Sequence, residues 1–314
     1  MTGKRATERL DADDAGIARA VEILRRGGLA AIPTETVYGL AARADDADAV
    51  AAIYAAKGRP SFNPLIVHVP DMAAAEALAE WDERARSLAA AFWPGPLTIV
   101  LPLCADAGLA PAVTGGLDTI ALRCPAHPVM RDVLAGLGTP LAAPSANRSE
   151  TVSPTQAGHV LATLDGRIDA VLDAGPCERG LESTIVAVER DGGWSVLRPG
   201  PIAVGQLAAV TGTAPEDAGG TIRAPGQLAR HYAPGKPVRL EAQTARADEF
   251  LIGFGEVLGD WSLSPGGDLA EAAARLYAGL HRAAQSGQAR IAVAPIPHEG
   301  LGTAINDRLK RAAA

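Results

Sequence analysis

Short apolar runs alternate with amphipathic helical patterns along the first two thirds of the chain, and this alternation restricts the fold more than any other feature. The pattern GIARAVEILRR, which ends at a pair of glycines, predicts a helix over residues 13–26. The runs LAAIP, LIVHV and TIALRCP are typical of short buried strands. Several neighbouring strands are joined by hairpin-like turns, so we expect a twisted mixed α/β sheet and not a regular parallel one.

The composition is that of a globular protein with few aromatic side chains. Hydrophobic residues make up 48% of the 314 residues and charged residues 21%, so we expect an ordered chain long enough for two domains. Aromatic residues are only 4%, and the core must therefore be built from Ala, Val, Leu and Ile. The net charge of −7 argues against a protein whose main task is to wrap nucleic acid, but it is compatible with a local basic pocket for phosphates.

Cysteine spacing and the N-terminal sequence both favour a cytoplasmic protein. Cys104, Cys124 and Cys177 are widely spaced without a C-x-x-C pair, which indicates neither a zinc site nor a disulfide framework. We expect reduced, mostly buried thiols. The N-terminal sequence lacks the apolar core of a signal peptide, and no apolar run is long enough to span a membrane.

The composition changes near residue 212, where glycine and proline cluster without a periodic apolar face. We predict a first domain over residues 13–203, a linker over residues 204–237 and a small α/β domain over residues 238–314. In the last domain, FLIGFG and IAVAPIP are typical of strands, whereas DLAEAAARLYAGLHRAAQ and INDRLKRA are typical of helices.

Polar and charged side chains gather at predicted strand ends, most densely in PTETVYGL and KGRPSFNPLIVH. Periodicity alone would place a charge anywhere on a solvated face, whereas ligand-contacting groups of α/β proteins sit where strands end and loops begin. Similar segments follow in APSANRSETVSPT, GLESTIV and LRPGPI. We interpret the set as one binding site, although each residue alone has a simpler structural explanation.

The side chains in these segments are mostly hydroxyl, amide and guanidinium groups, with few carboxylates. An arginine fork binds phosphate or carboxylate in a bidentate manner, and hydroxyls donate to phosphate oxygens. This inventory favours phosphoryl or nucleotidyl transfer, in which catalysis is mostly positioning and charge stabilisation. The candidates on this basis are Lys57, Arg59, Arg123, Arg148, Arg198, Ser145, Asn147, Ser153, Ser183 and Thr184.

Structural roles remain open for several of these residues. Ser153 precedes a proline and is predicted as the N-cap of a helix over residues 153–164, although a capped helix start is also an anion site. Arg123 is either a surface charge or a ligand contact, and Glu35 is either a catalytic base or a turn-stabilising carboxylate. His68 ends an apolar strand, where a core histidine with satisfied hydrogen bonds is the usual outcome.

Missing motifs argue against several enzyme classes. The chain has no G-x-S-x-G, and its cysteines lie outside polar or electropositive motifs, so nucleophilic hydrolysis is a poor interpretation. It also lacks the G-x-G-x-x-G and G-x-x-x-x-G-K-[ST] loops that hold nucleotides in the commonest folds. The histidines outside the polar segments have no metal-ligand spacing.

Taken together, PTETVYGL, KGRP-x-x-NPL, SAN-x-S with SPT, and LESTIV resemble the YrdC-like threonylcarbamoyl-AMP synthases in their long, two-domain form. The resemblance covers roughly residues 13–203 as the catalytic domain, RHYAPGKP as the linker and the tail as a smaller, Rossmann-like α/β domain. One departure is Glu150, which stands where many relatives have glycine. We predict that the linker acts as a lid over the ATP site, because a tether rich in glycine and proline with one tyrosine suits a movable cover.

The resemblance also implies a reaction. L-Threonine and bicarbonate form a carbamate, which attacks the α-phosphorus of ATP and expels pyrophosphate. The product, threonylcarbamoyl-AMP, is used by a separate transferase to modify the adenosine beside the anticodon of certain tRNAs. Mg²⁺ is expected on the ATP phosphates, with no dedicated protein ligands.

Site residues are carried over by their positions in the matching motifs. The implied threonine-binding residues are Thr36, His68, Arg123, Ala143 and Ser183, with Arg123 on the carboxylate. The implied ATP-binding residues are Lys57, Arg59, Asn63, Thr119, Ser145, Ser153, Arg198, His231 and Tyr232.

The sequence favours this enzyme over two other interpretations. A non-catalytic RNA-binding module is disfavoured by the acidic total charge and the shortage of aromatics, and direct tRNA binding is expected to be weak at most. A carbamoyl-transfer role in hydrogenase maturation would come with zinc-finger cysteines and an acylphosphatase segment, which the sequence lacks. Pyrophosphate release that requires threonine and bicarbonate together separates the enzyme from the binding module.

Overall fold

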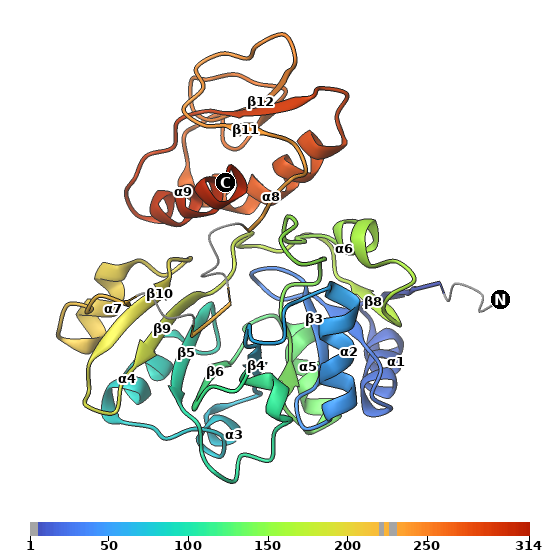
Figure 1. Cartoon of the computed structure of the whole chain (residues 1–314), viewed down its shortest axis with the longest axis vertical. Helices are drawn as coiled ribbons and strands as arrows, with labels where there is room; N and C mark the ends of the chain where they lie inside the picture. The colour runs from blue at the N-terminus through green and yellow to red at the C-terminus, as the bar shows by residue number, and fades with distance from the viewer. Residues whose placement is uncertain (1–5, 220–222, 226–230) are drawn as a thin grey trace.

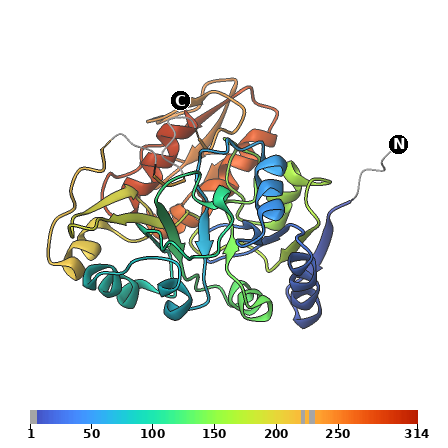
Figure 2. The ribbon, with the colours of Figure 1, turned by 60° about the horizontal axis from the view of Figure 1, so that its bottom comes forward.

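The computed structural model describes residues 6–219, 223–225 and 231–314, which form two domains stacked along the long axis of the molecule (Figure 1). Among these residues, ten strands form one sheet and four form another. The first described strand lies at an edge of the larger domain, and the C-terminus lies in the smaller one (Figures 1 and 2).

The large sheet is mixed, as the sequence predicts. Parallel pairs such as β4 with β6 and β5 with β9 stand beside antiparallel pairs such as β2 with β3 and β5 with β6. Its strands, in spatial order, are β1 (Glu8–Asp11), β8 (Ala170–Asp173), β2 (Ala30–Ile32), β3 (Gly39–Arg43), β7 (Leu141–Ala142), β4 (Ile66–His68), β6 (Thr119–Arg123), β5 (Leu97–Pro102), β9 (Thr184–Val188) and β10 (Trp194–Arg198).

The first four α-helices of the first domain each begin after an aspartate whose side chain caps the helix. Asp13 accepts from the backbone N–H of Gly16 at the start of α1, and Asp46 caps α2 in the same way. Gly58 closes α2 at φ 63°, a left-handed conformation that glycine adopts without strain. The helices are α1 (Asp14–Arg25), α2 (Ala47–Lys57), α3 (Met72–Glu76), α4 (Glu83–Phe92), the 3₁₀ turn η1 (Pro111–Val113), α5 (Pro128–Leu137), α6 (Ala157–Leu164) and α7 (Val204–Thr211).

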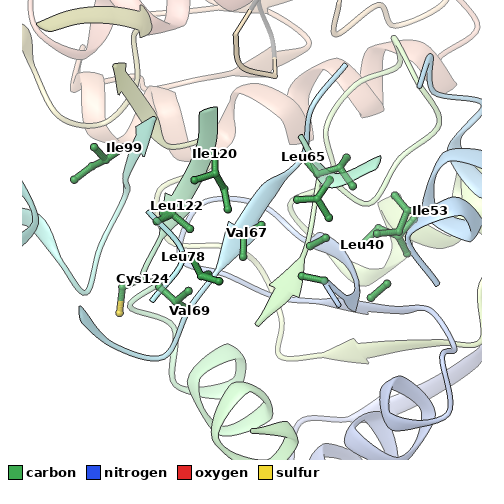
Figure 3. Packing of buried hydrophobic residues seen from close by; sticks show 14 of the residues in the cluster. Leu40, Ile53, Leu65, Val67, Val69, Leu78, Ile99, Ile120, Leu122 and Cys124 are labelled. Carbon is green, nitrogen blue, oxygen red and sulfur yellow. The ribbon is translucent and has the colours of Figure 1, made fainter. Parts of the chain in front are cut away.

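Alternation of side chains along the strands divides the core between the two faces of the sheet. Leu40, Val67 and Leu122 point to one face, where they pack with residues of α2, α3 and α4 (Figure 3). The other face has two separate clusters, one under α1 and α5 around Ala41 and one around Ala121. The second face therefore holds the side chains that alternate with Val67 and Leu122.

The register of β4 and β6 places two candidate side chains next to each other on that second face. His68 follows Val67 and Arg123 follows Leu122, and the two residues are direct partners in the parallel ladder. Both lie at the carboxyl ends of their strands, where ligands bind in open α/β sheets. This pairing brings residues from PLIVH and LRCP together, as predicted for a single binding site.

The second domain is a four-stranded parallel sheet with two helices on one face. Its sheet order is β11 (Val238–Arg239), β14 (Arg290–Val293), β12 (Glu249–Gly253) and β13 (Trp261–Ser262). The helices α8 (Leu269–Gln285) and α9 (Leu301–Ala312) pack on Phe250, Ile252 and Ile291. In Figure 1 these helices face the first domain, and β11 and β12 lie on the far side.

The predicted linker starts with ordered structure. Helix α7 occupies residues 204–211 and packs against α4, so this part of the linker belongs structurally with the first domain. Further along, Ala224 is fully buried in the small cluster around Ala121, and Ala233 forms a bridge with Thr151. Residues 220–222 and 226–230 of the predicted linker, including the first residue of RHYAPGKP, lie outside the described residues.

The two domains share one apolar cluster. Val37, Val152 and Leu181 of the first domain pack in the same cluster as Tyr232 of the linker and Tyr277 of α8. Nearby, the rings of His159 on α6 and His281 on α8 stack with centroids 3.9 Å apart. The second domain is therefore docked on the first through side chains of both.

The structure differs from the sequence predictions in the short elements. Ser153 does not cap a helix, because α6 begins at Ala157 after Gln156, and the Ser153 hydroxyl donates to a carboxylate instead. The sequence patterns do not predict the strands β1, β3, β11 and β13. They are two to five residues long, and alternation over so few residues gives almost no periodic signal.

The thiols are free, as expected, with Cys124 and Cys177 buried and Cys104 partly exposed. Within the described part of the chain, no helix is both long enough and apolar enough to cross a membrane.

Candidate active site

A cavity on the second face of the large sheet gathers residues from many of the polar segments. Its volume is about 40 Å³. It is lined by Thr34, Thr36, Val37, Gly39, Arg59, Ile66, His68, Arg123, Ala143, Pro144, Ser145, Glu182, Ser183, Arg198, Pro225 and His231.

The turn between β2 and β3 contributes two hydroxyls whose orientations are fixed by hydrogen bonds. The Thr34 hydroxyl donates to the carbonyl of Val37 at 2.7 Å and accepts from the backbone N–H groups of Thr36 and Val37. Its proton is therefore used, so in the 2.8 Å contact between the two threonine hydroxyls Thr36 must be the donor. The Thr36 oxygen is left with acceptor capacity toward the cavity.

Arg123 and Glu35 form a buried ion pair at the end of β6. The Arg123 Nη2 lies 2.6 Å from Glu35 Oε1, and Nε donates to the carbonyl of Gly95. Glu35 Oε2 also accepts from the backbone N–H of Ala126. Burial alone would raise the pKa of the Glu35 carboxyl, but the Arg123 guanidinium keeps it below its ordinary value.

This pair argues against one of the two roles left open for Glu35, that of a catalytic base. A carboxylate with a lowered pKa is a poor general base at neutral pH, so Glu35 orients Arg123. Arg123 Nη1 has no hydrogen-bond partner among the described residues, whereas Nε and Nη2 are occupied. A fixed guanidinium with one free nitrogen in a cavity is suited to bind a carboxylate.

His68 is buried beside Arg123 and is not a histidine with satisfied hydrogen bonds. Its Nδ1 has no hydrogen-bond partner in the described part of the chain. Burial, together with the Arg123 charge, lowers the pKa of His68 to about 3, so the ring is neutral at neutral pH. A neutral imidazole with an unpaired nitrogen in a cavity wall is a candidate ligand contact.

Two further arginines, Arg59 and Arg198, line the same cavity. Arg59 is held by Asn63, whose side-chain oxygen accepts from Nη2 at 2.7 Å, and burial lowers the pKa of Arg59 to about 10. Arg198 donates through Nε and Nη2 to the carbonyl of Ser183 and through Nη2 to its hydroxyl. That hydroxyl also contacts Thr98 at 2.7 Å. Both guanidinium groups are therefore fixed by neighbouring groups before a ligand binds.

Lys57 is buried but does not line the cavity. Its Nζ donates to the carbonyls of Ser145 and Asn147, at 2.6 and 2.5 Å. Burial, with a contribution from Arg59, holds its pKa well below the ordinary value. Lys57 therefore supports the loop that presents Ser145 to the cavity.

The loop that follows contains the unusual Glu150, which has a φ of 68°. This is the left-handed region where glycine carries no strain, so the loop keeps a glycine-like backbone in spite of the side chain. The carbonyl of Glu150 accepts from the N–H of Ala233, which ties the loop to the linker.

Many of the predicted site residues lie together, and others lie around them. Those that line the cavity are Thr36, Arg59, His68, Arg123, Ala143, Ser145, Ser183, Arg198 and His231. Asn63 and Lys57 support lining residues, and Ser153 and Tyr232 are buried in the cluster between the domains. Thr119 is not in the cavity wall, because it stands at the opposite end of β6 from Arg123. The roles assigned to these residues stay predictions.

Sequence reasoning missed Glu182 as a functional residue. Its side chain lines the cavity and is 6% exposed, and its Oε1 accepts from the Ser153 hydroxyl at 2.5 Å. The sequence feature that could have indicated Glu182 is a carboxylate inside the apolar segment LESTIV. The other partners of Glu182 come from the second domain, and no nearby sequence pattern predicts them.

Comparison with known proteins gives consistent results. Residues 22–200 match the Sua5/YciO/YrdC family, described as telomere recombination, and residues 202–314 match the family described as the C-terminal domain of threonylcarbamoyl-AMP synthase. The chain is 40% identical to the threonylcarbamoyl-AMP synthase of Bacillus subtilis, covering 98% of this chain and 95% of that protein. It is 38% identical to the synthase of Pyrococcus abyssi, covering 93% and 92%.

A solved structure is similar over both domains. The crystal structure of P. abyssi Sua5 complexed with L-threonine aligns with a TM-score of 0.88 and 35% sequence identity, and it covers 98% of this chain and 97% of that one.

Proposed function

The chain belongs to the Sua5/YciO/YrdC family, and we propose that it is an enzyme that converts ATP, L-threonine and bicarbonate to threonylcarbamoyl-AMP and pyrophosphate. The observation that carries this proposal is the cavity whose wall contains Arg123, Thr36 and His68 together with Arg59 and Arg198. Such a set of groups suits a small zwitterion bound beside a polyphosphate.

The proposed threonine-binding part of the cavity follows from the unused hydrogen-bonding groups of three residues. The unoccupied Nη1 of Arg123 would bind the α-carboxylate, and the Thr36 oxygen, which can only accept, would bind the amino group. The unpaired Nδ1 of His68 would bond the substrate hydroxyl or carboxylate. Since the pKa of His68 is about 3 and that of Glu35 is lowered, neither is suited to remove a proton, and these residues act by binding and orientation.

The nucleotide side would be formed by Arg59 and Arg198, with Ser145 contributing a hydroxyl. The carbamate oxygen attacks the α-phosphorus, and the bond to the pyrophosphate oxygen breaks as negative charge develops there. Guanidinium groups already fixed by Asn63 and Ser183 stabilise that charge with little reorganisation. We propose that Mg²⁺ enters as part of the substrate, bound to the ATP phosphates.

The size of the cavity supports a lid role for the linker. Small-molecule sites usually enclose several hundred cubic ångströms, whereas this cavity measures about 40 Å³. Pro225 and His231 of the linker form part of its wall. ATP would therefore enter after the linker moves away, and closure of the linker would then exclude water from the reaction.

The product is a mixed anhydride of a carbamic acid and a phosphate, which water hydrolyses. We propose that it passes to a separate transferase that modifies tRNA beside the anticodon. A net charge of −7 does not favour strong tRNA binding by this chain itself.

Pyrophosphate release measured with purified full-length protein tests the proposal. Release is expected only when ATP, L-threonine and bicarbonate are all present, with threonylcarbamoyl-AMP identified by mass spectrometry. Absence of release with all three substrates, or release that is independent of threonine, would reject the function.

A further inference from the structure

The carboxylate of Glu182 is shared between the two domains. One oxygen, Oε1, accepts from the Ser153 hydroxyl of the first domain at 2.5 Å. The other, Oε2, accepts from the Tyr277 hydroxyl of α8 at 2.8 Å and from Arg308 Nε of α9 at 2.9 Å. The same side chain forms part of the cavity wall, so a contact with the second domain reaches the proposed active site directly.

Arg308 is fully buried although it carries a charge. Its Nη1 donates to Asp307 at 2.7 Å, and its Nη2 has no hydrogen-bond partner in the described residues. The guanidinium carbon lies 5.4 Å from the centre of the Tyr232 ring, which in turn stacks on Tyr277. Arg308 therefore contacts both Glu182 and the linker residue that is predicted to reach the nucleotide.

The charge of Glu182 matters because of its surroundings. Burial alone would raise its pKa, but Arg308 and then Arg198 lower the pKa to about 2, so the group is ionised. Arg198 also lines the cavity and is a proposed phosphate contact. Without Arg308, the carboxylate would be attracted to the cavity arginines and would compete there with the negative charges of ATP.

Stability alone does not explain this arrangement. Buried ion pairs contribute little net stability, because desolvation of both charges offsets their attraction, and well-packed apolar side chains are often at least as stable. A fully buried arginine with an unpaired nitrogen is therefore a costly way to join two domains. Its cost is accounted for if the position of Glu182 is what the contact secures.

We propose that Arg308 and Tyr277 are positioning residues for ATP binding, through which the second domain holds Glu182 away from the phosphate-binding arginines. This inference rests on the proposed function. It assigns the second domain a defined task. Arg308 compensates the negative charge of Glu182 in the cavity wall, and the same contacts hold Tyr232 next to Glu182.

The test uses full-length protein and steady-state pyrophosphate release with ATP and threonine varied separately. Arg308→Met is expected to raise the KM for ATP about tenfold, because the released Glu182 carboxylate competes with the phosphates for Arg198, and to change the KM for threonine less than about twofold. The matched control is Arg239→Met. This variant breaks the ion pair between Arg239 and the buried Glu249, which lie in the sheet of the same domain. Arg239→Met is expected to leave both KM values unchanged.

A double variant separates positioning from direct contact with ATP. In Glu182→Gln/Arg308→Met the competing carboxylate is absent, so the KM for ATP should return to within about threefold of the wild-type value. If Arg308 bound ATP itself, the double variant would remain as impaired as the single one, and the inference would be wrong. Should Arg308→Met fail to fold, Arg308→Lys, which keeps the charge but not the fork, is expected to raise the KM for ATP by a smaller factor.

The outcomes distinguish this inference from the function on which it rests. Wild-type protein that releases no pyrophosphate refutes the proposed function. Active wild-type protein whose Arg308→Met variant matches Arg239→Met, or changes both KM values equally, leaves the function intact and overturns the positioning role.

Discussion

Replacing Arg123 by methionine should separate threonine binding from ATP binding. Methionine fills a similar volume without the charge, so the change removes the proposed carboxylate contact and leaves the surrounding strands in place. Arg123 also pairs with Glu35, which is buried, and the substitution therefore affects stability as well as activity.

The two effects have different sizes. A hydrogen bond between charged groups contributes roughly 1.5–3 kcal/mol, so loss of the carboxylate contact should lower kcat/KM for threonine about a hundredfold. Glu35 would keep backbone partners such as the N–H of Ala126 but lose its cation, and a buried ion pair broken on one side costs about 3–5 kcal/mol of stability. In Arg123→Met/Glu35→Gln the unpaired charge is absent, so most of the stability should return while threonine binding should not.

Pyrophosphate release with threonine varied at saturating ATP and bicarbonate measures the first effect, and urea unfolding measures the second. The KM for ATP serves as the internal control and should change by less than about threefold, since Arg123 is held by Gly95 and Glu35, whereas Arg59 and Arg198 are held by Asn63 and Ser183. A double variant with near wild-type kcat/KM for threonine would refute the carboxylate role. A single variant as stable as the wild type would refute the pairing argument.

Three further predictions concern single residues. Glu150→Gly should stabilise the protein by about 1 kcal/mol in urea unfolding, because the φ of 68° strains any side chain, and an unchanged or lower stability would contradict this. Lys57→Met should lower the free energy of unfolding by about 1–3 kcal/mol and reduce turnover, because the carbonyls of Ser145 and Asn147 lose a donor. Full activity would show that the loop keeps its conformation without Lys57. The pKa of Glu182 is lowered from 4.5 to about 2, so its contribution of roughly 3 kcal/mol is present above pH 4.5 and is lost as the pH falls toward 2. Glu182→Gln should flatten the dependence of the free energy of unfolding on pH in that range. Equal slopes for the variant and the wild type would contradict the lowered pKa of Glu182.

The fold class could be predicted because it depends on local patterns. The longer helices and the apolar strands have clear periodicity and caps, as with Asp46 at the start of α2. Two-residue strands such as β11 and β13 contain too few positions for alternation to be recognised, and they are specified by their neighbours in the sheet. The N-cap predicted at Ser153 failed for a related reason, because a buried carboxylate from another segment takes its hydroxyl.

The site could be predicted where a motif holds its own partners. Arg59 and Asn63 are four residues apart and bond each other, so the KGRP-x-x-N pattern contains the geometry. Glu182 and Arg308 are 126 residues apart, and no local sequence feature of either residue predicts its contact with the other. Contacts that form only when two domains dock have no periodic or motif signature, and they require coordinates.

The stacked rings of His159 and His281 provide an intrinsic reporter of whether the two domains are in contact. The chain has only six histidines, so their imidazole resonances can be resolved and assigned by single substitutions. Ring currents from a neighbour with its centroid 3.9 Å away shift those resonances, and separation of the domains would abolish the shift. Titration with nucleotide would thus reveal any hinge opening in solution without a label attached to the protein.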